Sequence, residues 1–378
     1  MGDITGPAIA ALAIGAVLSV ILLVPLIATE YRLWGTLSLG RLFLILAFIP
    51  YLISMPLYTL LPLDGDIASL CHASAETMVR LHPFAFVTDI HHEAMRVGWS
   101  TTLSSSVFRQ AYLNILFFVP LGMFLSRVYR IPRWAVVPVG FAVSLAIELT
   151  QLTGNWGLSA CQYRYFDVDD LILNTFGAIL GIALAPALAL IPGTGLRMAD
   201  RVRPQPVTRK RRLVQLFCDG LILGLILLAE RAVASSILRV MGRSASERPV
   251  LSILLLATTI LLFIVVPLVG GGVTLGERTV LIRVATRQGA PPPLPRVVLK
   301  GMAGGGMLGV LGSLAEGGIS WAAPVAILLA TVAIGWVMVD PQGMTCRASG
   351  LRRYDERDRP QPEKATADGE GKNPSRYD

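Results

Sequence analysis

Long apolar stretches constrain this chain more than any other feature of its sequence. A helix needs about 20 consecutive apolar residues to cross the hydrocarbon core of a bilayer, so stretches of this length predict membrane spans. Of the 378 residues, 53% are hydrophobic and only 15% are charged, which is unusual for a soluble protein. Lipid excludes open sheet edges, and the sequence lacks the alternating pattern of barrel strands. We therefore predict an all-α integral membrane protein.

The predicted fold is a polytopic helical bundle with about nine spans, and eight spans are the alternative. The predicted spans are residues 8–29, 42–62, 109–126, 134–153, 170–192, 213–230, 250–269, 298–315 and 321–339. The eighth is the weakest, because Lys300 lies in it and the run Gly304–Gly306 interrupts it. It could instead be an interfacial or re-entrant segment.

Lys and Arg residues are unevenly divided between the two sets of loops. With the N-terminus outside, the cytoplasmic segments hold 25 of the 33 Lys and Arg residues. Cytoplasmic loops carry such an excess, so we predict an N-out, C-in, multi-pass protein of a bacterial plasma membrane. The net charge of +8 comes from these short loops. It does not indicate a nucleic-acid partner.

A basic run with two prolines divides the chain into two parts. We predict a five-span domain over residues 1–195, a cytoplasmic linker over 196–212, and a second membrane domain over 213–340. The linker is interpreted as a topology anchor, with binding to anionic lipid as the alternative. Residues 341–378 are polar, charged and poor in aromatic residues, so we predict a disordered cytoplasmic tail.

Glu148 is the most informative single residue, because it lies in the apolar run from Trp134 to Leu152. A carboxylate in hydrocarbon costs roughly 2.5–3.5 kcal/mol on insertion scales. Such a residue is therefore usually paired, faces a water-filled cavity or has a function. Ser144, Glu148 and Gln151 are spaced i, i+4 and i+7, so they form one polar stripe on the predicted helix.

Polar residues of two other segments are predicted at the same outer end of the bundle. Asn114 lies one turn below the outer end of the third span. The entry to the fifth span carries Arg164, Asp167, Asp169, Asp170 and Asn174. At about 1.5 Å per residue, all these groups fall within one or two helical turns of the same depth. We therefore predict that three distant segments converge on one polar layer.

Two interpretations of this layer remain open. Asp170, Asn174, Gly177 and Gly181 share one helix face, and the glycines would let the fifth span approach a neighbour closely. The layer could be a satisfied buried network in which Arg164 pairs with an acid and fixes helix packing. Alternatively, it is an outward-facing pocket for a ligand. We favour the pocket, because so many polar groups exceed the needs of one packing contact.

Two motifs carry a resemblance to a known family. The first is the run Asn114–Gly122, with Pro120 before the last two residues. The second begins with Ser144, Glu148 and Gln151 and continues through Arg164, Asp167, Asp170, Asn174, Gly177 and Gly181. Together they resemble the signatures of the VanZ-like family over about residues 40–190. That family is named for a protein linked to resistance to the lipoglycopeptide teicoplanin. The resemblance implies an envelope protein and no defined reaction.

A second resemblance covers about residues 208–355. Arg212 and Asp219 lie two turns apart on one predicted helix, and Thr274-Leu275-Gly276 is followed by Arg278. This order resembles the RDD family of small membrane proteins, for which transport is often suggested. The closing His-Asp pair of that family is absent, and Asp340 stands near its place. Pairing of Arg212 with Asp219 to anchor a helix is the alternative interpretation of these two residues.

Two cysteines and all four histidines fall in predicted outer loops. Cys71 and Cys161 could form a disulfide in an oxidising compartment, with two free thiols as the alternative. His91 and His92 precede Glu93, but the spacing matches no zinc motif. We therefore predict surface histidines and no metal site.

Three functional hypotheses follow. The first is a cell-envelope protein without enzymatic activity, which binds a lipopeptide or cell-wall lipid at the outer leaflet. The second is a secondary transporter in which Glu148 and Asp219 carry protons or cations. The third is an intramembrane enzyme in which Asp167, Asp169 and Asp170 act as acids or bases. No nucleophile motif or P-loop occurs in the sequence, so we favour the first hypothesis, with no cofactor and with the lipid bilayer as partner.

Overall fold

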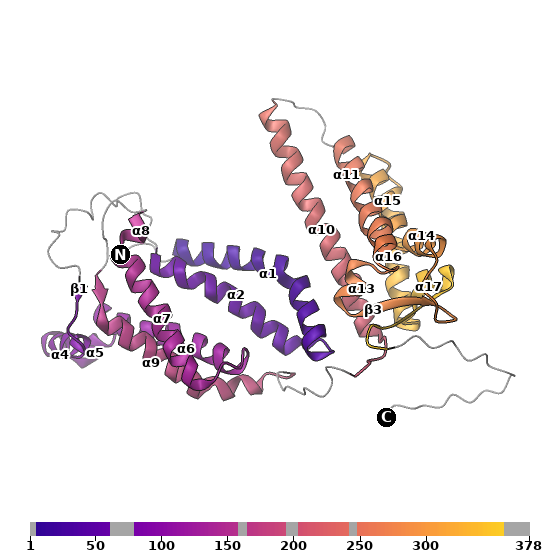
Figure 1. The fold of residues 1–378 in the computed structure, drawn as a ribbon. Helices are drawn as coiled ribbons and strands as arrows, with labels where there is room; N and C mark the ends of the chain where they lie inside the picture. The colour runs from indigo at the N-terminus through magenta and orange to yellow at the C-terminus, as the bar shows by residue number, and fades with distance from the viewer. Residues whose placement is uncertain (1–4, 61–78, 158–164, 194–202, 242–247, 359–378) are drawn as a thin grey trace. The chain divides into compact units, whose positions relative to one another are not determined.

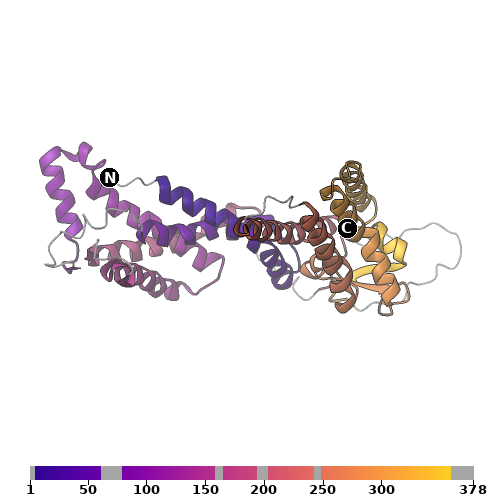
Figure 2. The same cartoon turned by 90° about the horizontal axis from the view of Figure 1, so that it is seen from above.

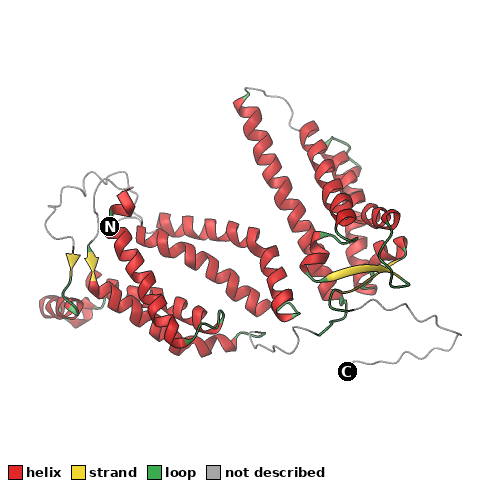
Figure 3. Cartoon of the chain, in the orientation of Figure 1, coloured by secondary structure: helices red, strands yellow, loops and turns green. Residues whose placement is uncertain are grey.

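A computed structural model describes residues 5–60, 79–157, 165–193, 203–241 and 248–358. Helices dominate these residues, and nine of them are long and apolar enough to cross a membrane (Figure 3). The predicted class of a helical, polytopic membrane protein is therefore confirmed. The chain divides into two compact units. Unit 1 comprises residues 1–22 and 38–196, and unit 2 comprises residues 23–37 and 197–378.

Unit 1 contains five long helical segments and several short elements (Figure 1). The long segments are α1 (Thr5–Trp34, which begins in this unit), α2 (Leu39–Leu60), α6 (Ser106–Arg127), α7 (Arg133–Leu152) and α9 (Val168–Leu184), which continues as the 3-10 helix η1 (Ala185–Leu190). The short elements are β1 (Val79–Arg80), α4 (Ala85–Val97), α5 (Trp99–Thr102), α8 (Gly154–Gly157) and β2 (Phe166–Asp167). Helices α6, α7 and α9 lie side by side in both views (Figure 1, Figure 2).

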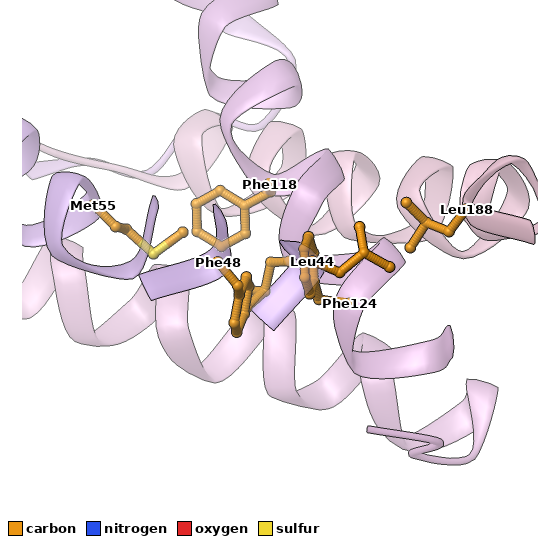
Figure 4. Packing of buried hydrophobic residues seen from close by; sticks show 7 residues of the cluster. Leu44, Phe48, Met55, Phe118, Phe124 and Leu188 are labelled. Carbon is orange, nitrogen blue, oxygen red and sulfur yellow. The ribbon is translucent and has the colours of Figure 1, made fainter. Parts of the chain in front are cut away.

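An aromatic core joins α2 to α6 in unit 1. The rings of Phe48 and Phe124 stack at 4.3 Å, and Phe118 and Met55 are buried beside them (Figure 4). The Tyr51 hydroxyl donates a hydrogen bond to the Phe117 carbonyl at 2.7 Å. Aromatic pairs of this kind are worth about 0.5–1.5 kcal/mol beyond their burial. The core therefore ties α2 to α6 and leaves the polar end of α6 to other partners.

Unit 2 is built from helices and one antiparallel pair of strands. Its first helices are α10 (Arg209–Val240) and α11 (Arg248–Ile260), which continues as the π-helix η3 (Leu261–Val265) and α12 (Val266–Val269). Then follow α13 (Leu275–Thr279), β3 (Ile282–Thr286), α14 (Leu294–Gly301), the π-helix η4 (Met302–Gly306), α15 (Met307–Glu316) and α16 (Ala322–Val339). The last elements are α17 (Gly343–Ser349) and β4 (Leu351–Asp355).

The weak eighth span is helical throughout Leu294–Glu316. Its glycines do not end the helix but widen it locally into η4, in which Gly304 has non-helical φ and ψ. A Cβ on Gly305 would lie 2.4 Å from the Phe263 ring, so this glycine permits close packing against η3. The helix is long and apolar enough to cross a membrane, which favours nine spans over eight.

The predicted disorder of residues 341–378 is wrong for the first part of that range. Strand β4 pairs antiparallel with β3, with Leu351 opposite Thr286 and Asp355 opposite Ile282. The charges that made this segment look soluble have buried partners: Asp355 accepts from Arg211 at 2.7 Å. Residues 359–378 lie outside the described residues.

The first helix is divided between the two units. The first 22 residues of the chain belong to unit 1, whereas residues 23–37 cluster with unit 2. Within unit 2, the Tyr31 ring lies 5.7 Å from the Arg211 guanidinium.

Candidate functional site

Glycines on α9 set the geometry of the polar end of unit 1. A Cβ on Gly177 would lie 2.2 Å from the Ile115 carbonyl oxygen, and a Cβ on Gly181 would lie 2.2 Å from that of Val119. Helix α9 therefore lies directly against the backbone of α6, as small residues allow. The next turns of α9 toward its N-terminus carry Asn174 and Asp170, which are consequently held against both α6 and α7.

Asp170 connects two of the three segments. The Asn114 side-chain amide on α6 donates to the Asp170 carboxylate at 2.5 Å. On α7, the Ser144 hydroxyl lies 3.5 Å from the Asp170 carbonyl oxygen and accepts from the Asn174 amide at 2.9 Å. Ser144 and Asn174 are buried. The structure thus brings together the amide, hydroxyl and acid that the sequence placed at one depth.

Glu148 is buried to 1% exposure, although its helix is apolar. Its carboxylate accepts the backbone N–H of Asp167 at 3.0 Å, which fixes the residue before α9 against α7. The Asp167 carboxylate in turn accepts the backbone N–H of Asp169 at 2.9 Å and so caps the N-terminus of α9. An acid at this position satisfies an otherwise unpaired N–H and interacts favourably with the helix dipole.

Asp169 has a role that the sequence did not reveal. Its two carboxylate oxygens accept the backbone N–H groups of Phe84 and Phe86, at 2.6 and 2.7 Å. Phe84 is the residue before α4 and has φ +65°, and its side chain has no acceptor atom with which to cap the helix. A buried acid of α9 therefore substitutes for the missing cap of α4. No local pattern around Phe84 could have indicated this contact, because its partner is 85 residues away.

A short parallel pair of strands also contacts Asp167. Val79 and Arg80 of β1 pair with Phe166 and Asp167 of β2, and the Arg80 guanidinium lies 3.6 Å from the Asp167 carboxylate. Burial raises the pKa of Asp167, and the hydrogen bond from the Asp169 N–H and the charge of Arg80 oppose that rise only in part. The pair is half-exposed at Arg80, so its free energy is small.

The contacts named above do not include every predicted residue. Gln151 is buried at the same end of α7 as Glu148. Arg164, Cys71 and Cys161 lie outside the described residues, so the predicted Arg164 pairing and the predicted disulfide stay predictions. His91 and His92 are exposed on α4. Across the described part of the chain, no group of three or more His, Cys, Asp and Glu side chains is placed to hold a metal ion.

Unit 2 contains a second buried polar cluster, around the residues of the second resemblance. Arg212 and Asp219 are both buried on α10, and Gln215 between them bonds to each. The Asp219 carboxylate also accepts the Thr274 hydroxyl at 2.8 Å and the Gly276 N–H at 2.7 Å. Arg278 is exposed and is not part of this cluster.

Glu277 is the centre of the unit 2 cluster, and the sequence reasoning did not single it out. Its carboxylate accepts the Lys300 ammonium at 2.5 Å and the Arg353 guanidinium at 2.9 Å, and Arg212 lies 3.7 Å away. Burial by itself would raise the pKa of Glu277, but these three cations outweigh burial and hold it far below its usual range. Thr274 and Glu277 form a capping box on α13, and the Thr-x-x-Glu pattern in the sequence was the available signal.

Comparison with known proteins agrees with the first half of this description. Residues 48–190 match the protein-family model VanZ/LLP1. That range contains Asn114, Ser144, Glu148 and the acids at the start of α9, and it confirms the predicted VanZ-like resemblance. No curated protein and no solved structure matches the chain. The comparisons give no support for an RDD-like segment over residues 208–355, so that resemblance stays a prediction.

Proposed function

We propose that this chain is a bacterial cell-envelope protein that contributes to glycopeptide or lipoglycopeptide resistance without catalysis. Its VanZ-like unit binds an amphiphilic ligand at the acid-rich end, by which we mean Glu148, Asp167, Asp169 and Asp170 together with the α4–α5 segment. The proposal includes a plasma-membrane location with the N-terminus outside, so that the acid-rich end faces the outer leaflet. The observation that carries it is the linked set Asn114–Asp170, Glu148–Asp167 and Asp169–Phe84, which lies within the family match.

The hydrogen bonds of Asp167 and Asp169 to backbone N–H groups hold neighbouring segments in place, and this is the part of these acids in the proposal. Asp169 holds the start of α4, and Asp167 holds the start of α9 against β1. The α4–α5 segment presents apolar side chains to its surroundings, and Trp99 is 61% exposed. Exposed aromatic and apolar residues beside charged ones are typical of a surface at the membrane–water interface. An amphiphilic ligand would place its apolar part on this surface.

A resistance assay tests the proposal. The gene would be expressed in a teicoplanin-susceptible bacterium, and the minimal inhibitory concentration would be compared for the wild type, Asp169→Asn and Trp99→Ala. Both variants should lose the increase in resistance while their abundance in the membrane stays unchanged. The matched control is Trp134→Ala, because Trp134 is 78% exposed at the other end of α7. Full resistance in the Asp169 and Trp99 variants would exclude the acid-rich end as the site.

Binding by the purified protein gives a second, independent measurement. The full chain in phosphatidylcholine nanodiscs should bind teicoplanin more tightly than a glycopeptide that lacks an acyl chain, because the apolar surface contributes burial. Equal affinities would contradict an amphiphile site.

Secondary transport through Glu148 and Asp219 stays the alternative. The two acids belong to separate units, and a proteoliposome flux that Asp219→Asn abolishes would support transport. Intramembrane catalysis by Asp167, Asp169 and Asp170 is the further alternative.

A further inference from the structure

Unit 2 contains a partly open cavity of about 270 Å³ that the proposed function does not use. This volume is close to the lower end of the range of about 300–1,000 Å³ that is common for small-molecule sites. Its walls come from α10, η3, α12, α13, α14, η4, α15, α16, α17 and β4. The cavity is therefore internal to one compact unit.

One end of the cavity is charged. Its ionisable lining residues are three cations, Arg212, Lys300 and Arg353, and two acids, Asp219 and Glu277. All five are at least nine-tenths buried. Among these five lining residues, the cations exceed the acids by one charge. A buried charge without a counter-ion is costly, so this end favours an added anion.

The excess is concentrated on Arg212. Lys300 and Arg353 each make close contacts with Glu277, whereas Arg212 stands 3.7 Å from the same carboxylate. The Nε atom of Arg212 is buried and, among the described residues, has no hydrogen-bond partner. Buried donors are satisfied in the great majority of cases, so an unpartnered guanidinium N–H beside a cavity points to an absent acceptor.

The opposite end of the cavity is apolar. On α10, Leu216 and Leu223 follow Arg212, with Asp219 between the two leucines, and α15 contributes Leu308 beyond Lys300. The remaining aliphatic wall is on α16, at Leu329, Val332, Ala333 and Val337. Along α10, the distance from Arg212 to Leu223 is about 16 Å at about 1.5 Å per residue. The cavity thus changes from charged to apolar along one direction.

We propose that this cavity is a binding site for a single-chain anionic amphiphile. Its phosphate or carboxylate group accepts from Arg212, and its hydrocarbon chain lies along Leu216, Leu223 and Leu308. A guanidinium and an ammonium are strong donors to such groups. A free inorganic anion would leave the apolar end unfilled, and a neutral or cationic amphiphile would leave the Arg212 donor unpaired.

The charge requirement can be measured with probes that share one chain. The full chain in phosphatidylcholine nanodiscs would be titrated with dodecyl phosphate, dodecanoate, dodecanol and dodecyltrimethylammonium, and bound probe would be counted by native mass spectrometry. Either anion should bind at least about tenfold more tightly than the alcohol, and the cation should bind most weakly. Equal binding of all four probes would overturn the proposal. Competition by inorganic phosphate at the same concentration as dodecyl phosphate would also overturn it.

Two glycines of α10 provide a matched test of location. Gly220 lines the cavity and Gly224 does not, and an added Cβ at either position meets open space. Gly220→Leu should weaken dodecyl phosphate binding about tenfold or more, as expected from displacing about two buried methylene groups. Gly224→Leu should leave binding unchanged. Equal binding to both variants would place the probe elsewhere.

A second pair of variants tests the role of Arg212. Arg212→Lys keeps the charge, so it should retain more affinity than Arg212→Gln.

Discussion

Glu277 in unit 2 lies among cations, whereas the acids at the start of α9 in unit 1 accept several backbone N–H groups. In unit 1, Glu148, Asp167 and Asp169 accept backbone N–H groups, and Asp170 accepts from the Asn114 amide. In unit 2, Glu277 faces three cations at once. The backbone hydrogen bonds in unit 1 position chain segments. The arrangement in unit 2 is a buried ion cluster whose free energy depends on every member being present.

This difference appears in the titration of the acids outside the spans. Burial raises the pKa of Asp167, because neutral donors and a half-exposed Arg80 do not compensate for it. Burial would also raise the pKa of Glu277, yet the surrounding cations reverse the shift. The same holds for Asp355, where burial is outweighed by hydrogen bonds from Arg357 and the charge of Arg211. The units should therefore respond differently to charge removal and to acid.

The largest expected effect is that of Glu277→Gln. It leaves Arg212, Lys300 and Arg353 buried without their shared carboxylate, which costs about 3–5 kcal/mol in comparable buried ion pairs. Hydrogen exchange of peptides from α13, β3 and β4 in the detergent-solubilised protein would measure the loss in unit 2, while α6 and α9 peptides should stay protected. The control is Glu316→Gln, whose partially exposed pair with Arg231 at 3.9 Å is worth at most about 1 kcal/mol. Equal losses in the two variants would contradict the ion-cluster interpretation.

The next largest expected effect is that of acid, which should lower the stability of unit 2 more than that of unit 1. The folded pKa of Glu277 is depressed, so its contribution is fully present above the unfolded value of about 4.3 and is lost as pH falls toward the folded pKa. Asp355 acts in the same direction. The raised pKa of Asp167 has the opposite sign, because the folded state of unit 1 binds that proton more readily. Exchange protection measured at decreasing pH below about 4.3 should therefore fall first in unit 2, and Glu277→Gln should flatten this dependence.

The close approach of α6 and α9 offers an uncharged comparison. Gly177→Ala places a Cβ 2.2 Å from the Ile115 carbonyl oxygen, so the helices must separate, at a cost of about 1–3 kcal/mol. Gly224→Ala on α10 meets open space and should instead gain about 0.5–1 kcal/mol from helix propensity. Thermal unfolding midpoints of the two variants should therefore shift in opposite directions. A neutral Gly177→Ala would mean that the helices tolerate a wider spacing.

Spacing along single helices predicted much of unit 1. The i, i+4, i+7 and i+11 pattern of Asp170, Asn174, Gly177 and Gly181 was sufficient to predict a close, polar-ended face, and the structure places it against α6 and α7. The Asp169 contact with Phe84 was not predictable, because it depends on a left-handed residue and a long-range approach. In unit 2, Lys300 made the eighth span look weak in the sequence. The structure explains this charge, because Lys300 pairs with the buried carboxylate of Glu277.

The burial of Arg353 could not be predicted from the composition of its segment. The residue lies in a segment so polar that disorder was the natural prediction, yet it is almost completely buried. Its guanidinium reaches Glu277, the Thr345 hydroxyl and the Gln342 carbonyl at the same time. A charged residue is buried when its partners are supplied from elsewhere in the chain. A window of sequence around Arg353 does not contain Glu277.

The smallest expected effect belongs to the hydrogen bond between Asn114 and Asp170. Asn114→Ala removes the amide that donates to Asp170, and the cost should be about 0.5–1.5 kcal/mol, as for one hydrogen bond. Asp170→Asn replaces the charge by an amide that still offers an oxygen, so the two single changes and the double variant form a cycle. Their coupling in unfolding free energy should stay below that of a matched Glu277→Gln and Lys300→Met cycle. A larger coupling for Asn114 and Asp170 would mean that unit 1 also depends on a tightly coupled charge, and the contrast between the units would fail.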